Sequence, residues 1–465
     1  MAHDSPLSLK YFYIYNSSYG QKEGEEAQKI LYYYPTKTDL DSQIKNVGLT
    51  EAIIKFTETF NCNQQCESLH TQKTRQLYYQ PEDGFWMVLV LTVPTATKTK
   101  EGIDHLEYQS DEVQDNIYWA VLKQAYRSFQ LFNGSFSNIL DSEKDPTKLR
   151  YKLDHFFAKY LIKLKPQHAD ILDVFHGIQF LPLDKKTFLH VQTLVNLLEC
   201  SFPKVRHTAF LYNDQLVWSG LEPDDMQAMY RYLITSLLPA QMETELQGGP
   251  MPRQSAAFSA LHFGSRFVSG PSNLQGDDVG KIPKVYLKND DGPVICHLVI
   301  YRALNATVCL FIDEAVSLEM DFFQRLDIFL GHRLTSLGSE IAEQFNHSVA
   351  SAASAESGAK FVYFNQLNRA QKSTIHLDNR KSGNISVPVD VLRILADVNA
   401  DFMERKPTTG ETIVKTMNDF WVVGKLSNLR EFYVVIHHKN ANLIEINEEV
   451  KKLCDSQFKS IFFNE

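Results

Sequence analysis

Three short runs of aromatic and aliphatic residues recur along the chain, and each ends in Asn. They are Tyr11–Asn16, Thr208–Asn213 and Phe361–Asn365. Such runs favour β-strands, and Asn is a common turn residue. The pattern therefore predicts three strands, each followed by a turn, at widely separated points of the chain.

An amphipathic pattern follows each of these runs. In every case four apolar residues are spaced by 4, 3 and 4 positions. This spacing places the four side chains on one stripe of a helix, and we expect each stripe to cover a sheet. The three sets are Leu49, Ile53, Phe56 and Phe60; Met226, Tyr230, Leu233 and Leu237; and Val391, Leu395, Val398 and Phe402.

Each helix pattern is followed by more strand pattern and then by a second, longer helix pattern. The strand patterns span Phe85–Val93, Val294–Ile312 and Asp419–His437. The last of the long helices starts at Asn442, with Glu445 three residues later, which is the spacing of a capping box. The repeated order predicts an α+β fold of three similar domains, each a mostly antiparallel sheet covered by helices.

The domain boundaries follow from composition. We expect the first domain, with extra helices at its C-terminal end, in residues 1–200, the second in 201–346 and the third in 361–465. Residues 347–360 are rich in Ser and Ala and are typical of a linker. Residues 239–292 hold many Gly and Pro residues, which indicates a long inserted loop in the second domain.

Composition and charge exclude several classes of protein. Of the 465 residues 44% are apolar and 22% are charged, which is typical of folded globular chains. The net charge of -9 argues against a nucleic-acid binder. The polar N-terminus is unlike a secretion signal, and the longest apolar run, Trp86–Val93, is too short to span a bilayer. We expect a cytoplasmic protein without disulfides, with peripheral membrane contact at most.

Common catalytic, nucleotide-binding and metal-binding motifs are absent from the sequence. It contains no GxxxxGK[ST], GxGxxG, GxSxG, HExxH or EF-hand loop, so we expect no enzyme of these kinds and no cofactor. The spacing Cys62-x3-Cys66-x3-His70 could supply three zinc ligands. A fourth ligand is not evident nearby, so we interpret this stretch as a loop without metal. A zinc-dependent enzyme is the alternative.

A polar and basic segment, Leu69–Gln76, lies between a predicted helix and a predicted strand. Side chains in such a connection stand exposed, where they form a solvated loop or contact an acidic partner surface.

Five stretches spread over nearly the full length carry a family resemblance: Lys45–Ile53, Ser68–Lys73, Phe85–Val88, Thr208–Glu222 and Asn440–Cys454. In these stretches the chain resembles the Ccz subunit family of the Mon/Ccz guanine-nucleotide exchange complex. The resemblance implies three longin domains, each a five-stranded sheet with helices. It also implies an obligate heterodimer with a Mon subunit, joined in animals by a further regulator subunit.

The resemblance further implies a function without covalent chemistry. The paired first domains of such a complex bind the late-endosomal Rab GTPase and catalyse its exchange of GDP for GTP. The complex associates peripherally with endosomal, lysosomal or vacuolar membranes, and it promotes endosome maturation, fusion and autophagosome clearance. A longin-type scaffold or adaptor without exchange activity fits the same sequence and is the alternative.

We expect the exchange surface on the first domain. The residues that we expect to face the Rab or to shape that surface are His70, Gln72, Lys73, Arg75, Trp86 and Met87. The residues that we expect to support it, or to lie at the partner interface, are Leu49, Ile53, Phe56 and Phe60.

Overall fold

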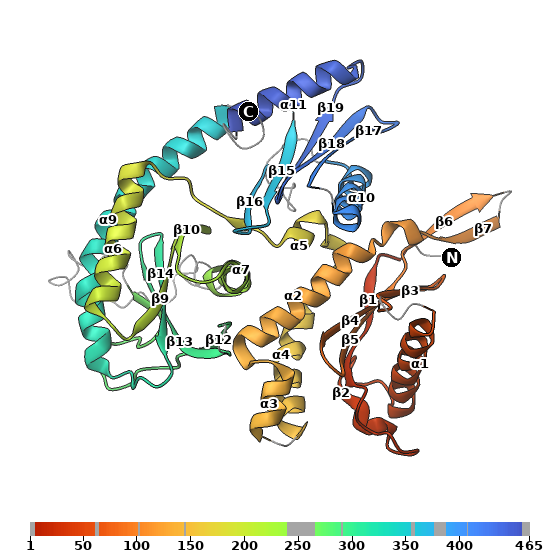
Figure 1. Cartoon of the computed structure of the whole chain (residues 1–465), viewed down its shortest axis with the longest axis horizontal. Coiled ribbons are helices and arrows are strands. Elements are labelled where there is room, and N and C mark those ends of the chain that lie inside the picture. Colours follow the sequence, from red (N-terminus) through yellow and green to blue (C-terminus); the bar gives the residue numbers. More distant parts are fainter. Residues whose placement is uncertain are drawn as a thin grey trace. The chain divides into compact units, whose positions relative to one another are not determined.

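The computed structural model describes residues 5–60, 65–100, 103–143, 146–239, 266–289, 292–354, 359–375, 387–406 and 408–457. The chain divides into two compact units (Figure 1). The first comprises Met1–Val174 and Leu377–Lys406, and the second comprises Phe175–His376 and Pro407–Glu465. Among the helices that the structure describes, none is both long and apolar enough to cross a membrane.

The first unit is built on a five-stranded antiparallel sheet with the order β2-β1-β5-β4-β3. Its strands are β1 (Ser8–Asn16), β2 (Ile30–Tyr34), β3 (Ser68–His70), β4 (Thr74–Glu82) and β5 (Phe85–Thr92).

Helices cover both faces of this sheet (Figure 1). Helix α1 (Leu40–Glu58) packs on a face rich in tyrosine, and α2 (Asp115–Asn133) and α4 (Pro146–Lys163) pack on the other through Phe129 and Phe157. The remaining elements of the unit are η1 (Glu26–Lys29), the hairpin β6 (Thr95–Lys100) and β7 (Ile103–Tyr108), η2 (Ser110–Glu112), α3 (Phe136–Glu143), η3 (Pro166–His168), α5 (Ile171–Phe175) at its boundary, and α10 (Val389–Arg405).

Helix α10 belongs to the third repeat in sequence but groups with the first unit. The side-chain amide of Gln114 donates to the Arg393 carbonyl at 2.9 Å and to the Asp397 carboxylate at 2.7 Å. The predicted stripe of α10 is buried throughout, as expected.

The second unit contains two sheets. One has the order β10-β9-β14-β13-β11, and β12 also pairs with β13. Helices α6 and α9 pack on one of its faces and α7 on the other (Figure 1). The elements are α6 (Lys185–Ser201), β9 (Val205–Tyr212), β10 (Gln215–Ser219), α7 (Pro223–Tyr232), the π-helical turn η4 (Leu233–Leu237), β11 (Arg266–Ser269), β12 (Lys284–Leu287), β13 (Val294–Ala303), β14 (Ala306–Asp313) and α9 (Met320–Ser354).

The other sheet has the order β17-β18-β19-β15-β16-β8, with α11 packed on it. Its elements are β8 (Ile178–Gln179), β15 (Lys360–Asn365), β16 (Ala370–Ser373), β17 (Thr409–Lys415), β18 (Phe420–Ser427), β19 (Arg430–His437) and α11 (Leu443–Gln457). The predicted capping box is confirmed, because the Glu445 amide donates to the Asn442 side chain and the Asn442 amide donates to the Glu445 carboxylate.

All three sheets share one strand order. When strands are counted within each repeat, the order is 2-1-5-4-3 in every case, with β11 and β12 both in the third position of the second repeat. This agreement confirms the α+β prediction and the threefold repeat.

Three details of the domain prediction differ from the structure. Residues 175–200, which we expected in the first domain, belong to the second unit, where α6 lies in the core of the second domain. The expected loop 239–292 contains β11 and β12, which are short and pair with β13. The expected linker 347–360 begins inside α9, which continues to Ser354 because Ala and Ser do not interrupt a helix.

Candidate functional site

The predicted stripe on α1 faces solvent instead of the sheet. Leu49, Phe56 and Phe60 are 54%, 62% and 75% exposed, and Ile53 is half-buried. The Phe56 and Phe60 rings contact each other edge to face, with their centroids 4.9 Å apart. Our expectation that this stripe covers the sheet is therefore wrong. We call Leu49, Phe56 and Phe60 the α1 stripe.

Polar residues of α1 face the sheet because the sheet presents hydroxyl groups. The Tyr13 hydroxyl lies 2.6 Å from the Thr50 hydroxyl, and the Asn46 side chain donates to the Tyr33 hydroxyl at 2.6 Å. Burial raises the pKa of Tyr33 to about 12, so this hydroxyl remains protonated at neutral pH. Buried hydroxyls need hydrogen-bond partners, and α1 supplies them. Val47 and Ile54 also face the sheet, whereas Leu49 and Phe56 are left on the outer side of the helix.

Gly48 lies on the outer side of α1, in the middle of the helix. A Cβ atom added there would meet nothing within 4 Å. Glycine inside a helix costs about 1 kcal/mol relative to alanine, and no contact in the described part of the chain requires it. With exposed Ala52 one turn later, Gly48 leaves the α1 backbone open to close approach beside the α1 stripe.

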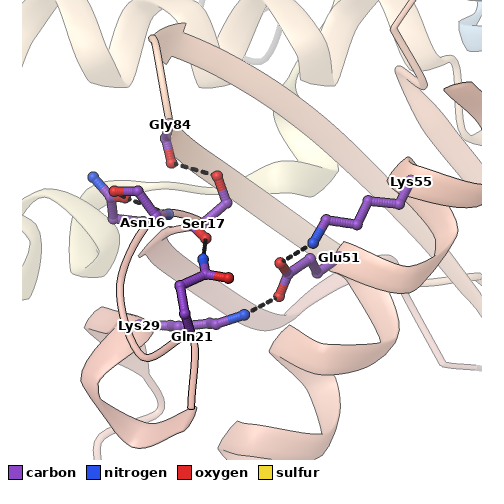
Figure 2. Close-up of polar contacts among 8 residues, drawn as sticks. Asn16, Ser17, Gln21, Lys29, Glu51, Lys55 and Gly84 are labelled. Atoms are coloured by element: carbon purple, nitrogen blue, oxygen red, sulfur yellow. Dashed lines mark hydrogen bonds and ion pairs between the residues drawn. The ribbon is translucent and has the colours of Figure 1, made fainter. Parts of the chain in front are cut away.

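A charged cluster fixes the orientation of α1. The Glu51 carboxylate accepts from the Lys29 ammonium at 2.6 Å and from the Lys55 ammonium at 2.8 Å, and Figure 2 shows this bridge between η1 and α1. Burial alone would raise the pKa of Glu51, but the two lysines outweigh it and hold that pKa below its usual range. In the same view the Ser17 hydroxyl donates to the Gly84 carbonyl at 3.3 Å. The Ser17 amide donates to the same carbonyl at 2.8 Å, and the two bonds anchor the start of the β1–β2 connection.

The segment 69–76 forms the β3–β4 hairpin. Its turn is closed by the Thr71 amide, which donates to the Thr74 carbonyl at 2.9 Å. Gln72 and Lys73 are exposed at the tip, and His70 is exposed beside them. The His70 ring nitrogen lies 2.6 Å from the Asp115 carboxylate, which holds the imidazole against the start of α2. Three of the predicted surface residues therefore share one hairpin.

The other three predicted residues are buried, so they do not face a partner themselves; the expectation that they shape the exchange surface stays a prediction. Arg75 donates to the Ser110 carbonyl at 2.8 Å and pairs with Asp115 at 3.3 Å. Trp86 and Met87 are 5% and 0% exposed. They lie in β5, which has a strand on each side and helices on both faces, so successive side chains both enter a core. In this conformation they cannot contact a partner directly.

Three residues of this site, Gly48, Thr50 and Glu51, were not predicted from the sequence. A glycine inside a helical pattern was the available signal for Gly48. Nothing in the sequence indicates that Glu51 meets Lys29, because they meet only when η1 folds against α1.

The metal prediction remains untested, because Cys62 lies outside the described residues. Of its two companions, the Cys66 thiol donates to the Ser68 carbonyl at 3.6 Å, and His70 contacts Ser68 and Asp115. Among the described residues no group of His, Cys, Asp and Glu side chains is arranged to hold a metal ion.

Comparison with known proteins identifies the class to which this fold belongs. Residues 9–134 match the family model "First Longin domain of INTU, CCZ1 and HPS4". Residues 205–331 and 355–453 match "Intu longin-like domain 2" and "Intu longin-like domain 3". The chain is a protein of three longin domains, as the resemblance implied.

Full-length relatives narrow the class to one family. Proteins named "Vacuolar fusion protein CCZ1 homolog" from Xenopus tropicalis and Nematostella vectensis are both 47% identical, over 460 and 454 residues. These alignments cover 98% and 97% of this chain and 97% of each relative. The Dictyostelium discoideum homolog is 30% identical over 459 residues, 98% of both chains. The chain belongs to the CCZ1 family.

Proposed function

We propose that this chain is a subunit of a heterodimeric guanine-nucleotide exchange factor, paired with a Mon subunit, that activates the late-endosomal Rab GTPase. Membership in a family named for vacuolar fusion supports a role in vacuolar and lysosomal traffic. The exchange activity, the Mon partner and the Rab target follow from the family resemblance. The complex acts at the surface of endosomal, lysosomal or vacuolar membranes.

The α1 stripe is the observation that most strongly supports a heterodimer. Isolated exposed apolar residues are ordinary, but Leu49 and Phe56 lie on the outer side of α1 beside the open backbone at Gly48, and Phe60, in the turn after the helix, contacts Phe56. Close approach of two helices needs small residues, and large aromatic residues next to them supply apolar area to bury. These features fit the packing of a helix from a similarly built subunit against the outer side of α1.

The proposed mechanism is catalysis by differential binding. The exchange surface binds the nucleotide-free GTPase more tightly than the nucleotide-bound form, and this difference in affinity displaces the loops that hold nucleotide and Mg²⁺. In this chain the exposed side chains of the β3–β4 hairpin, His70, Gln72 and Lys73, are the candidates for that contact. Asp115 fixes the position of His70, which reduces the entropy lost on binding.

The decisive experiment measures release of a fluorescent GDP analogue from the late-endosomal Rab. This chain alone, its Mon partner alone and the two together are compared, with the early-endosomal Rab as the specificity control. We expect acceleration only by the pair and only on the late-endosomal Rab. A stable, well-folded pair that accelerates nothing would overturn the proposal and leave a longin scaffold or adaptor as the better account.

Surface variants separate the two proposed contacts. Phe56→Ser with Phe60→Ser should weaken pairing, whereas Tyr151→Ser with Ile162→Ser, at comparably exposed positions of α4, should not. Lys73→Glu should slow GDP release by the intact pair, whereas Lys452→Glu, at an exposed position of α11, should not. Equal effects of a variant and its control would exclude that contact.

A further inference from the structure

Residues 175–181 lie between the first and second longin domains in sequence and outside all three family matches. Within the second unit, this short segment runs between two sheets. On one side β8 pairs in parallel with β16, and the Ile178 amide donates to the Arg369 carbonyl at 2.7 Å. On the other side Phe180 forms a parallel bridge with Leu216 of β10, and the Leu181 amide donates to the Leu216 carbonyl at 2.9 Å. We call residues 175–181 the strap.

The strap covers equivalent edges of the two sheets. β10 and β16 are the second strands of their longin repeats, and each would otherwise be an edge strand. Edge strands present unpaired backbone groups that readily bind another strand. Here the chain itself supplies the two-residue strand β8 to the edge at β16 and a single parallel bridge to the edge at β10.

The two ends of the strap are buried in different domains. The Phe175 ring stacks on Phe364 of β15 at 4.8 Å and contacts Tyr433 of β19 at 5.7 Å, both in the third domain. Leu181 lies in the core of the second domain, in the same cluster as Val191 and Leu194. Each end is thus fixed by a hydrophobic core, and the backbone between them is held on both sides.

Polar contacts fix the middle of the strap and join its neighbours. The buried Gln227 side chain of α7 donates to the Phe175 and His176 carbonyls at 3.0 and 2.9 Å. Arg369, in the turn before β16, donates to Asp224 of α7 at 2.8 and 3.1 Å. The second domain therefore binds the strap through Gln227 of α7. It also contacts the third domain directly, through the ion pair between Asp224 and Arg369.

Gly177 is where the strap passes closest to the third domain. Its amide donates to the Gln371 side chain at 3.0 Å, and an added Cβ would lie 2.2 Å from Gln371 Cβ. Any side chain at position 177 would displace the strap from β16.

We propose that the strap fuses the second and third longin domains into a single cooperative unit by pairing with the edge strand of each sheet, β16 through β8 and β10 through the Phe180 bridge. The domains then open and unfold together, so that a partner that binds one of them encounters a fixed arrangement of both. This coupling is a property of the chain itself and does not depend on exchange activity.

Hydrogen exchange tests the coupling in the full-length chain. The Ile178 and Leu181 amides report separately on the third and second domains, since they donate in opposite directions. We expect Gly177→Ala to speed exchange of both amides about tenfold or more. Gly276→Ala, where an added Cβ meets only ordinary contacts at 3.8 Å, should leave both amides unchanged.

The pattern of exchange decides the outcome. Faster exchange at Ile178 with an unchanged rate at Leu181 would show that the strap binds the two domains independently, and would overturn the proposal. Thermal unfolding gives a second measure, with one transition for the two domains in the unmodified chain and two in Gly177→Ala. A single unchanged transition in a natively folded Gly177→Ala chain would also overturn it. If Gly177→Ala does not fold, Gln227→Met, which removes the two side-chain donations at similar volume, is judged by the same two measurements.

Discussion

Substitution of Gly48 separates the stability of this chain from its ability to pair. The position is inside α1, and an added Cβ meets nothing within 4 Å. Alanine at such a position is favoured over glycine by about 1 kcal/mol through helix propensity alone, and leucine is close to alanine. We therefore expect both Gly48→Ala and Gly48→Leu to stabilise the isolated chain, with a rise of roughly 2–4 °C in the midpoint of the first unit.

Pairing should respond in the opposite direction. If a partner helix approaches the backbone at Gly48, a leucine side chain overfills the interface at a cost of about 1–3 kcal/mol. This cost corresponds to about a 5- to 150-fold increase in the dissociation constant of the heterodimer. Alanine should have a smaller effect, because one methyl group adds little volume.

Two assays test this reasoning. Thermal denaturation of the isolated chain measures the gain in stability, and titration calorimetry with the Mon subunit measures the loss of affinity. Destabilisation of the isolated chain by Gly48→Ala would refute the claim that the position is open. Unchanged affinity of Gly48→Leu for the partner would refute the claim that the α1 backbone is approached closely.

Three further predictions concern the first unit. The pKa of Glu51 is lower in the folded chain than its ordinary value of 4.5. Its charge therefore contributes its full stabilisation at pH values above 4.5, and this stabilisation is lost as the pH falls through the folded pKa. Glu51→Gln should therefore be less stable at neutral pH, by about 1 kcal/mol, with a smaller further loss in acid when both are followed by urea denaturation across pH. Trp86→Ala should cost about 3–5 kcal/mol of stability in the same assay, because it empties a core position, and native-like stability would contradict the burial described above. Lys73→Glu should change stability by less than about 0.5 kcal/mol, since the residue is exposed, and a larger loss would show that the hairpin tip is structural.

Much of the local structure could be predicted from the sequence, because it depends on residues that are close together in the chain. The runs that begin at Tyr11, Thr208 and Phe361 are strands, and the box of Asn442 and Glu445 caps α11. These features depend on propensities and hydrogen bonds within a few residues.

Only part of the candidate site could be predicted from the sequence. The hairpin residues His70, Gln72 and Lys73 are at the surface as expected, because turns connecting edge strands face water. Trp86 and Met87 are not, because β5 lies in the middle of its sheet, and the position of a strand in a sheet is set by pairings between segments far apart in sequence.

The sequence by itself determined the three repeats, their strands and the type of most helices, since alternation and helical spacing are local properties of the chain. Tertiary structure decided which side of α1 is buried, because the tyrosine hydroxyls beneath it require Thr50 and Asn46 as partners. It also decided the role of residues 175–181, which have no strong pattern of their own; Ile178 and Gln179 become a strand only beside β16, and Phe180 forms a bridge to β10. Burial and strand pairing depend on what surrounds a segment in space, and no local pattern encodes that environment.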